Sequence, residues 1–245
     1  MKIAAYTRYE LLRTVRNRRF MILALGFPLV LYFLIAAPNR HEQNLGGSGI
    51  SAPLYLMVGL VAFGAMNAVL GSGARIAAER ATGWNRQLRL TPLSPKTYFR
   101  TKVLTGYALA GMTIVLIYAS GTLLGVRLTA GEWVRMTALI LVGLIPFAAL
   151  GILFGHLLTP DSIGPALGGM TAALAILGGV WFPIPHHGVM YDVARGLPSY
   201  WLVQAAHIGV GGNGWGATGW VVLAIWTVVA TYFARRAYER DTKRA

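Results

Sequence analysis

Few side chains in this sequence have the type and spacing that chemistry requires. Glu79, His156 and Asp161 are candidate acids and bases, but no D-x-x-D or H-x-x-x-H spacing gathers them into one centre. The His186–His187 pair suggests a metal ligand. Neighbouring loop residues rarely both bind one ion, however, and Asp192 is the one carboxylate nearby. With no cysteine available either, we predict no catalytic residue and no metal site in this chain.

The elements that must position these residues are hydrophobic segments. Of 245 residues, 56% are hydrophobic and 12% are charged, whereas a soluble domain carries about 25% charged residues. A helix of about 20 apolar residues crosses the hydrocarbon core of a bilayer. The sequence therefore predicts an all-α membrane protein with one transmembrane domain over residues 1–245. Its six predicted transmembrane helices are 20–37, 53–73, 103–126, 136–158, 163–182 and 217–234.

The basic residues indicate how these spans are oriented. Most of the 22 Lys and Arg residues fall in segments 1–19, 74–102 and 235–245. Because successive spans cross the membrane in opposite directions, these three segments lie on the same side of it. The positive-inside rule assigns that side to the cytoplasm, so we predict that both termini are cytoplasmic and the membrane is the bacterial inner membrane. A net charge of +14 is typical of nucleic-acid binding too. Topology already explains these charges, and we predict no nucleic-acid partner.

The predicted membrane interior lacks a source of energy. No Asp, Glu, Lys or Arg lies deep in a span, and His156 is near a span end. Ion-coupled carriers normally need such groups at mid-depth. The chain also lacks a G-x-x-x-x-G-K-S/T phosphate loop. An ATPase on a separate chain would explain both absences, and this chain would then bind no cofactor itself.

Segment 74–102 is the predicted cytoplasmic segment that could receive such a partner. Its first part continues the second span as a helix, and Gly83 allows a turn. Residues 84–90 then form a short basic helix that Thr91 and Pro92 stop. Ser94 and Pro95 are typical of a helix start, as the cap and first residue. A short surface helix carrying Trp84 and Leu88 suits docking into a groove, although an ordinary positive-inside loop is the alternative.

These residues carry a resemblance to a known family. Glu79, Gly83, the run Leu-Arg-Leu-Thr-Pro-Leu-Ser-Pro over 88–95, and Lys102 resemble the cytoplasmic signature of ABC-2 type permeases. The resemblance covers nearly the whole chain and is nearest to small drug and antibiotic exporter permeases, such as those for daunorubicin. Trp84 departs from the pattern, because the family more often carries an acidic residue after the glycine.

The resemblance implies partners and site residues. It implies a coupling helix that contacts an ABC nucleotide-binding (ATPase) subunit holding ATP and Mg, and a second permease copy, in a homodimer or a related heterodimer. The ATPase-coupling residues are then Glu79, Gly83, Trp84, Leu88, Arg89, Thr91 and Pro92. Phe27, Asn67 and Thr171 are candidate contacts of the transport pathway.

Two further segments fit the same family pattern. Residues 1–19 form a predicted elbow helix at the membrane interface, with Leu11, Leu12 and Val15 on an apolar arc toward lipid. Residues 183–216 form an external segment that resembles a re-entrant helical hairpin. It contains helix-like stretches at 189–195 and 200–208, and Ser199 is a candidate cap for the second stretch.

The sequence thus predicts the permease subunit of an ATP-driven exporter for an amphipathic or lipophilic compound such as a drug, an antibiotic or a lipid. Two alternatives stay open. One is a membrane-embedded enzyme that modifies lipids, and the other is an ion-coupled carrier or channel. Turnover or currents from the chain alone would favour them.

Overall fold

A computed structural model of the chain describes residues 3–91, 93–212 and 214–243. Within those ranges the regular structure is helical and no strand occurs, which confirms the all-α prediction. The helices are α1 (Ile3–Arg16), α2 (Arg18–Ala36), η1 (Leu45–Gly47), α3 (Ala52–Ala81), α4 (Trp84–Arg89), α5 (Pro95–Leu123), α6 (Ala130–Gly143), α7 (Ile145–Leu157), α8 (Pro160–Leu177), α9 (Val189–Arg195), α10 (Pro198–Gln204), η2 (Ala205–Val210) and α11 (Ala217–Lys243).

Helix starts follow capping chemistry that is visible in the sequence. The Ser94 hydroxyl accepts a hydrogen bond from the backbone N–H of Thr97, and Pro95 is the first residue of α5. At α6, Thr129 and Glu132 form a reciprocal capping box. These side chains satisfy backbone donors that have no partner within the helix, so α5 and α6 begin at defined residues.

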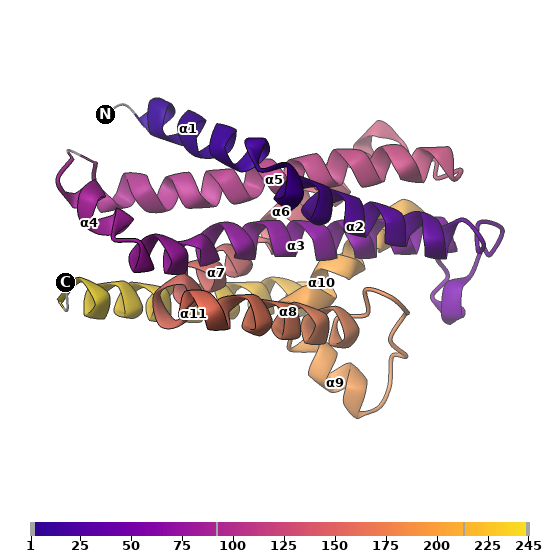
Figure 1. Cartoon of the computed structure of the whole chain (residues 1–245). Coiled ribbons are helices and arrows are strands. Elements are labelled where there is room, and N and C mark those ends of the chain that lie inside the picture. The colour runs from indigo at the N-terminus through magenta and orange to yellow at the C-terminus, as the bar shows by residue number, and fades with distance from the viewer. Residues whose placement is uncertain (1–2, 92, 213, 244–245) are drawn as a thin grey trace.

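Helix α3 is the central helix of the bundle. Most of its side chains are buried, and α2, α5, α7, α8 and α10 all pack against it (Figure 1). The start of α1, the end of α11 and α4 lie together at one end of the bundle, which we call the terminal end. Helix α9 and the segment between α2 and α3 lie at the other end, the far end (Figure 1).

Four stretches are long and apolar enough to cross a membrane. They are Ala52–Ala81, Pro95–Leu123, Ala130–Leu157 and Ala217–Asp241. Helix α11 leaves large apolar side chains such as Ile225 and Phe233 exposed, as lipid contact requires. The chain is therefore a multi-pass membrane protein. The apolar part of α2, Ile22–Ala36, is shorter, and α8 begins with Pro-Asp-Ser, so six spans stay a prediction.

The helices depart from the predicted spans at two places. Stretch 136–158 is not one helix, because α6 ends at Gly143 and α7 starts at Ile145. Pro146 lacks an N–H and its ring clashes with the carbonyl four residues earlier, which interrupts the helix there. Predicted span 163–182 extends beyond the end of α8 at Leu177, because Gly179 takes a left-handed conformation with φ 73°.

Two local features of the helices are also clear. Ser199 does not cap the short helix of the 183–216 segment, because Leu197 occupies the cap position of α10. Glycines also allow a close approach of two helices, at Gly151 and Gly155. A Cβ atom on Gly151 would lie 2.6 Å from the carbonyl oxygen of Leu70, so only glycine lets α7 cross α3 this closely.

Candidate functional site

The C-terminal end of α3 carries two adjacent charged residues that take different partners. Glu79 belongs to a buried group that we call the Glu79 cluster, and Arg80 belongs to a second group, the Arg80 cluster. Both groups lie at the terminal end, directly before α4. The Glu79 cluster consists of Glu10, Arg13, Glu79, Tyr98 and Lys102.

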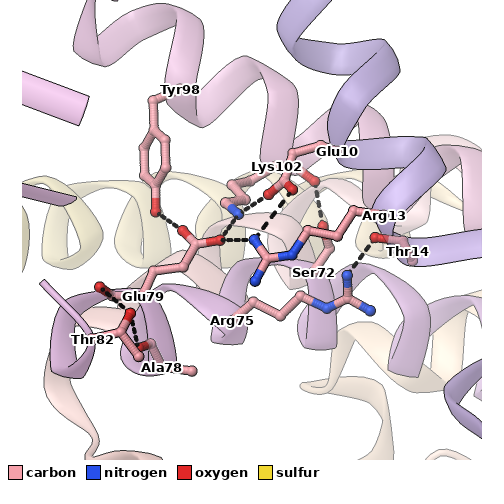
Figure 2. A network of polar contacts seen from close by, with 10 residues as sticks. All are labelled: Glu10, Arg13, Thr14, Ser72, Arg75, Ala78, Glu79, Thr82, Tyr98 and Lys102. Atoms are coloured by element: carbon pink, nitrogen blue, oxygen red, sulfur yellow. Dashed lines mark hydrogen bonds and ion pairs between the residues drawn. The ribbon is translucent and has the colours of Figure 1, made fainter. Parts of the chain in front are cut away.

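Lys102 of α5 is the centre of the Glu79 cluster. Its ammonium group pairs with the carboxylates of Glu10 from α1 and Glu79 from α3, as Figure 2 shows. The Tyr98 hydroxyl donates to Oε2 of Glu79 at 2.5 Å. The Lys102 side chain is 1% exposed, and both carboxylates are buried as well. Buried charges of this kind are tolerated only when they are paired and hydrogen-bonded, and here each has a partner from another helix.

Two arginines, Arg13 within this cluster and Arg75 beside it, add further polar contacts to α1 and α3. Nη1 of Arg13 lies 3.8 Å from a carboxylate oxygen of Glu10 and 3.8 Å from one of Glu79. Arg75 donates a hydrogen bond to the hydroxyl of Thr14, which links α3 to α1 (Figure 2). Helix α1 is thereby attached to the bundle through polar contacts.

The orientation of α1 agrees with these contacts. Tyr6, Glu10 and Thr14 recur every four residues, so they share one face of the helix, and all three are buried. Leu12 and Val15 are exposed on another face, as the predicted lipid-facing arc requires. Burial, with the carboxylates of Glu10 and Glu79 nearby, raises the pKa of Tyr6 above its usual range.

The Arg80 cluster ties α3 to α7 and α11. Nε and Nη2 of Arg80 each lie 2.7 Å from an oxygen of Asp241, in the two-pronged geometry that suits a guanidinium and a carboxylate. Nδ1 of His156 lies 3.1 Å from the same carboxylate. Arg80 also donates to the carbonyl oxygens of Gly155 and His156, which lie at the end of α7 and lack partners within that helix.

Helix α4 follows directly after the end of α3 that carries Glu79 and Arg80. Gly83 takes a left-handed conformation with φ 72°, which turns the chain sharply between α3 and α4. The Thr91 hydroxyl donates to the carbonyl of Leu88 and closes the helix end. Leu88 packs inward on a small apolar group that includes Tyr98, whereas Leu90 is 90% exposed. Helix α4 therefore packs on the bundle through Leu88, and Leu90, the residue directly after the helix, exposes an apolar side chain.

A cleft of about 520 Å³ opens between α1, α3 and α4. Charged and aromatic side chains share its wall, which makes it unlike an apolar cavity. The lining residues are Tyr9, Glu10, Arg13, Asn17, Arg75, Ala78, Glu79, Thr82 and Trp84.

The structure brings most of the predicted coupling residues together. Glu79 lies at the end of α3, and Gly83 and Trp84 lie at the turn into α4. Leu88 of α4 packs toward the bundle. The side chain of Arg89 and the whole of Pro92 lie outside the described residues. The coupling role of these residues stays a prediction.

The predicted pathway residues are distributed over three helices. The Phe27 ring on α2 lies 6.3 Å from the Phe63 ring on α3, measured between centroids. The Asn67 amide donates to the carbonyl of Phe63, a bond within α3. Thr171 is buried on α8, and its hydroxyl donates to Gly168 of the same helix. Phe27 thus lies beside the ring of Phe63, and Asn67 is bonded to the backbone of the same residue. The hydroxyl of Thr171 bonds within its own helix.

Sequence reasoning missed several members of the clusters. Glu10 is the single acidic residue among the basic residues of segment 1–19, and that exception was an available signal. Arg80 and Asp241 gave no such signal, because each resembles the exposed charges around it. Leu90 was included in the short helix but not among the coupling residues, and its exposure is visible only in the structure.

Comparison with known proteins identifies the family. The sequence model of the family described as "ABC-2 type transporter" matches residues 1–210, most of the chain. The chain belongs to the ABC-2 type transporter family. A curated protein of Bacillus subtilis (strain 168), "Putative transport permease YvfS", is 28% identical over 194 residues, which are 78% of this chain and 78% of that protein. These matches confirm the predicted resemblance to the ABC-2 type permease family.

Membership of the ABC-2 type transporter family makes this chain a transport permease and not an enzyme. The geometry of the acid and base candidates agrees. Glu79 pairs with Lys102, His156 pairs with Asp241, and Asp161 is exposed at the start of α8. The three candidates take different surroundings and do not form one acid–base site.

Proposed function

We propose that this permease is the membrane subunit of an ATP-driven exporter in the bacterial inner membrane, with both termini in the cytoplasm. Two permease copies work with nucleotide-binding subunits that hold ATP and Mg²⁺. They export an amphipathic or lipophilic compound. The observation that carries the proposal is α4, which packs on the bundle through Leu88 and is followed directly by the exposed Leu90 at the terminal end.

Force applied to α4 has a direct route into the bundle. Helix α4 follows α3 after a two-residue turn at Gly83, and Glu79 lies one helical turn before that point. The Glu79 cluster joins α3 to α1 and α5, and the Arg80 cluster joins α3 to α7 and α11. A partner that displaces α4 would therefore move five helices together, as a switch from inward to outward access requires.

The cargo is proposed from the residues along α2 and α3. The rings of Phe27, Phe63 and Trp181 form a continuous aromatic series, with centroid distances of 6.3 and 5.5 Å. Asn67 lies one helical turn from Phe63 and is among the few strongly polar side chains there. Aromatic surface with few polar groups suits an apolar or amphipathic molecule. Phe27, Asn67 and Thr171 are the proposed pathway contacts.

Leu90→Asp tests the proposal. Because Leu90 is 90% exposed, the charge should leave folding intact and disrupt an apolar docking contact. We expect the variant to lose most of its retention of the co-expressed ATPase and most of the ATPase stimulation by the permease. The matched control is Val189→Asp, which places the same charge on a residue that is 80% exposed on α9, at the far end.

The outcomes separate the competing functions. Equal ATPase retention and export by Leu90→Asp and Val189→Asp would refute the role of α4. Chemical turnover of lipid by the purified chain without ATP would favour the lipid-modifying enzyme, and currents in a bilayer would favour the carrier or channel. Leu88→Asp is less decisive, because Leu88 packs inward and the charge would also disturb the bundle.

A further inference from the structure

We propose that the cleft between α1, α3 and α4 binds the headgroup of a membrane phospholipid that carries both a phosphate and a primary ammonium, as phosphatidylethanolamine does. A volume of about 520 Å³ is large enough for such a headgroup. The proposal rests on the membrane position proposed above for this end of the bundle. It does not rest on ATP-driven export.

The cationic side of the cleft suits a phosphate. Arg13 from α1 and Arg75 from α3 both line it, so two guanidinium groups from different helices border one space (Figure 2). A guanidinium presents its N–H donors in a planar fork that matches phosphate oxygens. The Arg13 side chain is 54% exposed and its nearest carboxylate contacts are long, at 3.8 Å. It can turn toward a ligand without leaving a buried charge behind.

The acidic side of the same cleft restricts which class of ligand can bind there. Glu10 and Glu79 line the cleft together with the two arginines. Counting Lys102 behind them, three cations face two carboxylates, so the site is nearly neutral. A multiply charged anion would meet both carboxylates at short range. A zwitterion places its phosphate on the arginines and its ammonium on the carboxylates, and an N–H₃⁺ group donates hydrogen bonds that a trimethylated nitrogen cannot.

The surroundings favour a lipid over a soluble zwitterion. The exposed face of α1 carries Tyr9, Leu12 and Val15, and Tyr9 also lines the cleft. Trp84 borders the cleft from α4. Amphipathic aromatic side chains are enriched at the level of lipid headgroups, and a basic amphipathic helix lies in that plane. A headgroup entering here would keep its acyl chains along the apolar side of α1.

The test uses the full chain purified in detergent and titrated with short-chain phosphatidylethanolamine, phosphatidylcholine and phosphatidylglycerol, and with inorganic phosphate. Native mass spectrometry measures the bound fraction. We expect the ethanolamine lipid to bind at least tenfold more tightly than the choline lipid. Arg13→Ala should weaken that binding about tenfold, and Arg16→Ala, an exposed arginine on the same helix outside the cleft, should change it less than twofold.

Arg13→Lys is a control for loss of folding, because it keeps the positive charge and removes only the planar set of guanidinium donors. We expect it to bind the ethanolamine lipid with an affinity between those of the wild type and Arg13→Ala. Equal binding of the three lipids, or equal effects of Arg13→Ala and Arg16→Ala, would overturn the proposal. Binding of inorganic phosphate as tightly as the ethanolamine lipid, with the same dependence on Arg13, would overturn the lipid assignment. Leu90→Asp should bind lipid normally, so this result and the ATPase-coupling result stand independently.

Discussion

The two ends of the bundle are held together by different chemistry. At the terminal end, α1, α3 and α5 meet through the buried charges of Glu10, Glu79 and Lys102. At the far end, neutral indole N–H groups donate to backbone carbonyls. The Trp215 side chain donates to Trp201, and the Trp201 side chain donates to Arg195. Similar helices are thus joined by ion pairs at one end and by single neutral hydrogen bonds at the other.

This difference concerns how firmly each end fixes the arrangement of its helices. A buried ion pair adds little net stability over an apolar replacement, yet losing one partner is costly. Such a network therefore selects one arrangement of its helices and strongly disfavours slightly altered ones. Under the proposed function, we expect the terminal end to exchange between discrete arrangements of α1, α3 and α5 rather than to deform gradually. Three single substitutions and one triple variant test the comparison, in decreasing order of expected effect.

Lys102→Met is expected to have the largest effect. It leaves the carboxylates of Glu10 and Glu79 buried without their shared cation, which should cost about 3–5 kcal/mol of unfolding free energy. Denaturation in detergent micelles, followed by circular dichroism, measures the loss. The matched control is Lys96→Met on the exposed start of the same helix. Equal stability of the two variants would refute the role of the buried charges.

Adding Glu10→Gln and Glu79→Gln to Lys102→Met sharpens that result. The triple variant no longer buries a carboxylate without its cation, and Arg13, which loses both of its carboxylate partners, is 54% exposed. It should therefore regain a large part of the lost stability. If the proposed function is right, it should stay defective in ATPase stimulation, because the arrangement of α1, α3 and α5 is no longer selected. Recovery of both properties together would show that charge does not select the arrangement.

Trp215→Phe at the far end is expected to have an intermediate effect. The substitution keeps an aromatic ring but leaves the buried carbonyl of Trp201 without its donor, which should cost about 1–3 kcal/mol. ATPase stimulation should be unchanged in the folded fraction. Trp220→Phe is the control, because Trp220 is half-exposed beside the same ring. A loss as large as that of Lys102→Met would remove the contrast between the ends.

Arg235→Ala should have the smallest effect. Arg235 and Glu239 form an ion pair one helical turn apart on α11, and both side chains are at least half exposed. Solvent screens such a pair, which contributes about 0.3–0.5 kcal/mol in a helix. The same denaturation measurement should place this variant within that range of the wild type. A larger loss would mean that surface charge at the terminal end also holds the bundle.

Local patterns were enough to predict much of this fold. Ser94 and Pro95 fixed the start of α5, and residues 189–195 match the bounds of α9, because capping and turn chemistry act over a few neighbouring residues. The break at Leu144 could be anticipated only by weighing Pro146 against a strongly apolar run, and hydropathy alone does not record it.

The candidate site was only partly predictable. Glu79 and Lys102 were chosen by resemblance, but the third member, Glu10, lies 92 residues before Lys102, and no local pattern encodes that pairing. The different directions of Leu88 and Leu90 depend on the turn at Gly83 and on the end of α4. Contacts between distant segments therefore had to come from the structure.

The adjacency of Glu79 and Arg80 constrains how α3 can move. Successive residues of an α-helix project about 100° apart, so these two side chains contact different neighbouring helices. Rotation or sliding of α3 against fixed neighbours would break both sets of ion pairs. The central helix should therefore move only when α1, α5, α7 and α11 move with it, as one rigid unit.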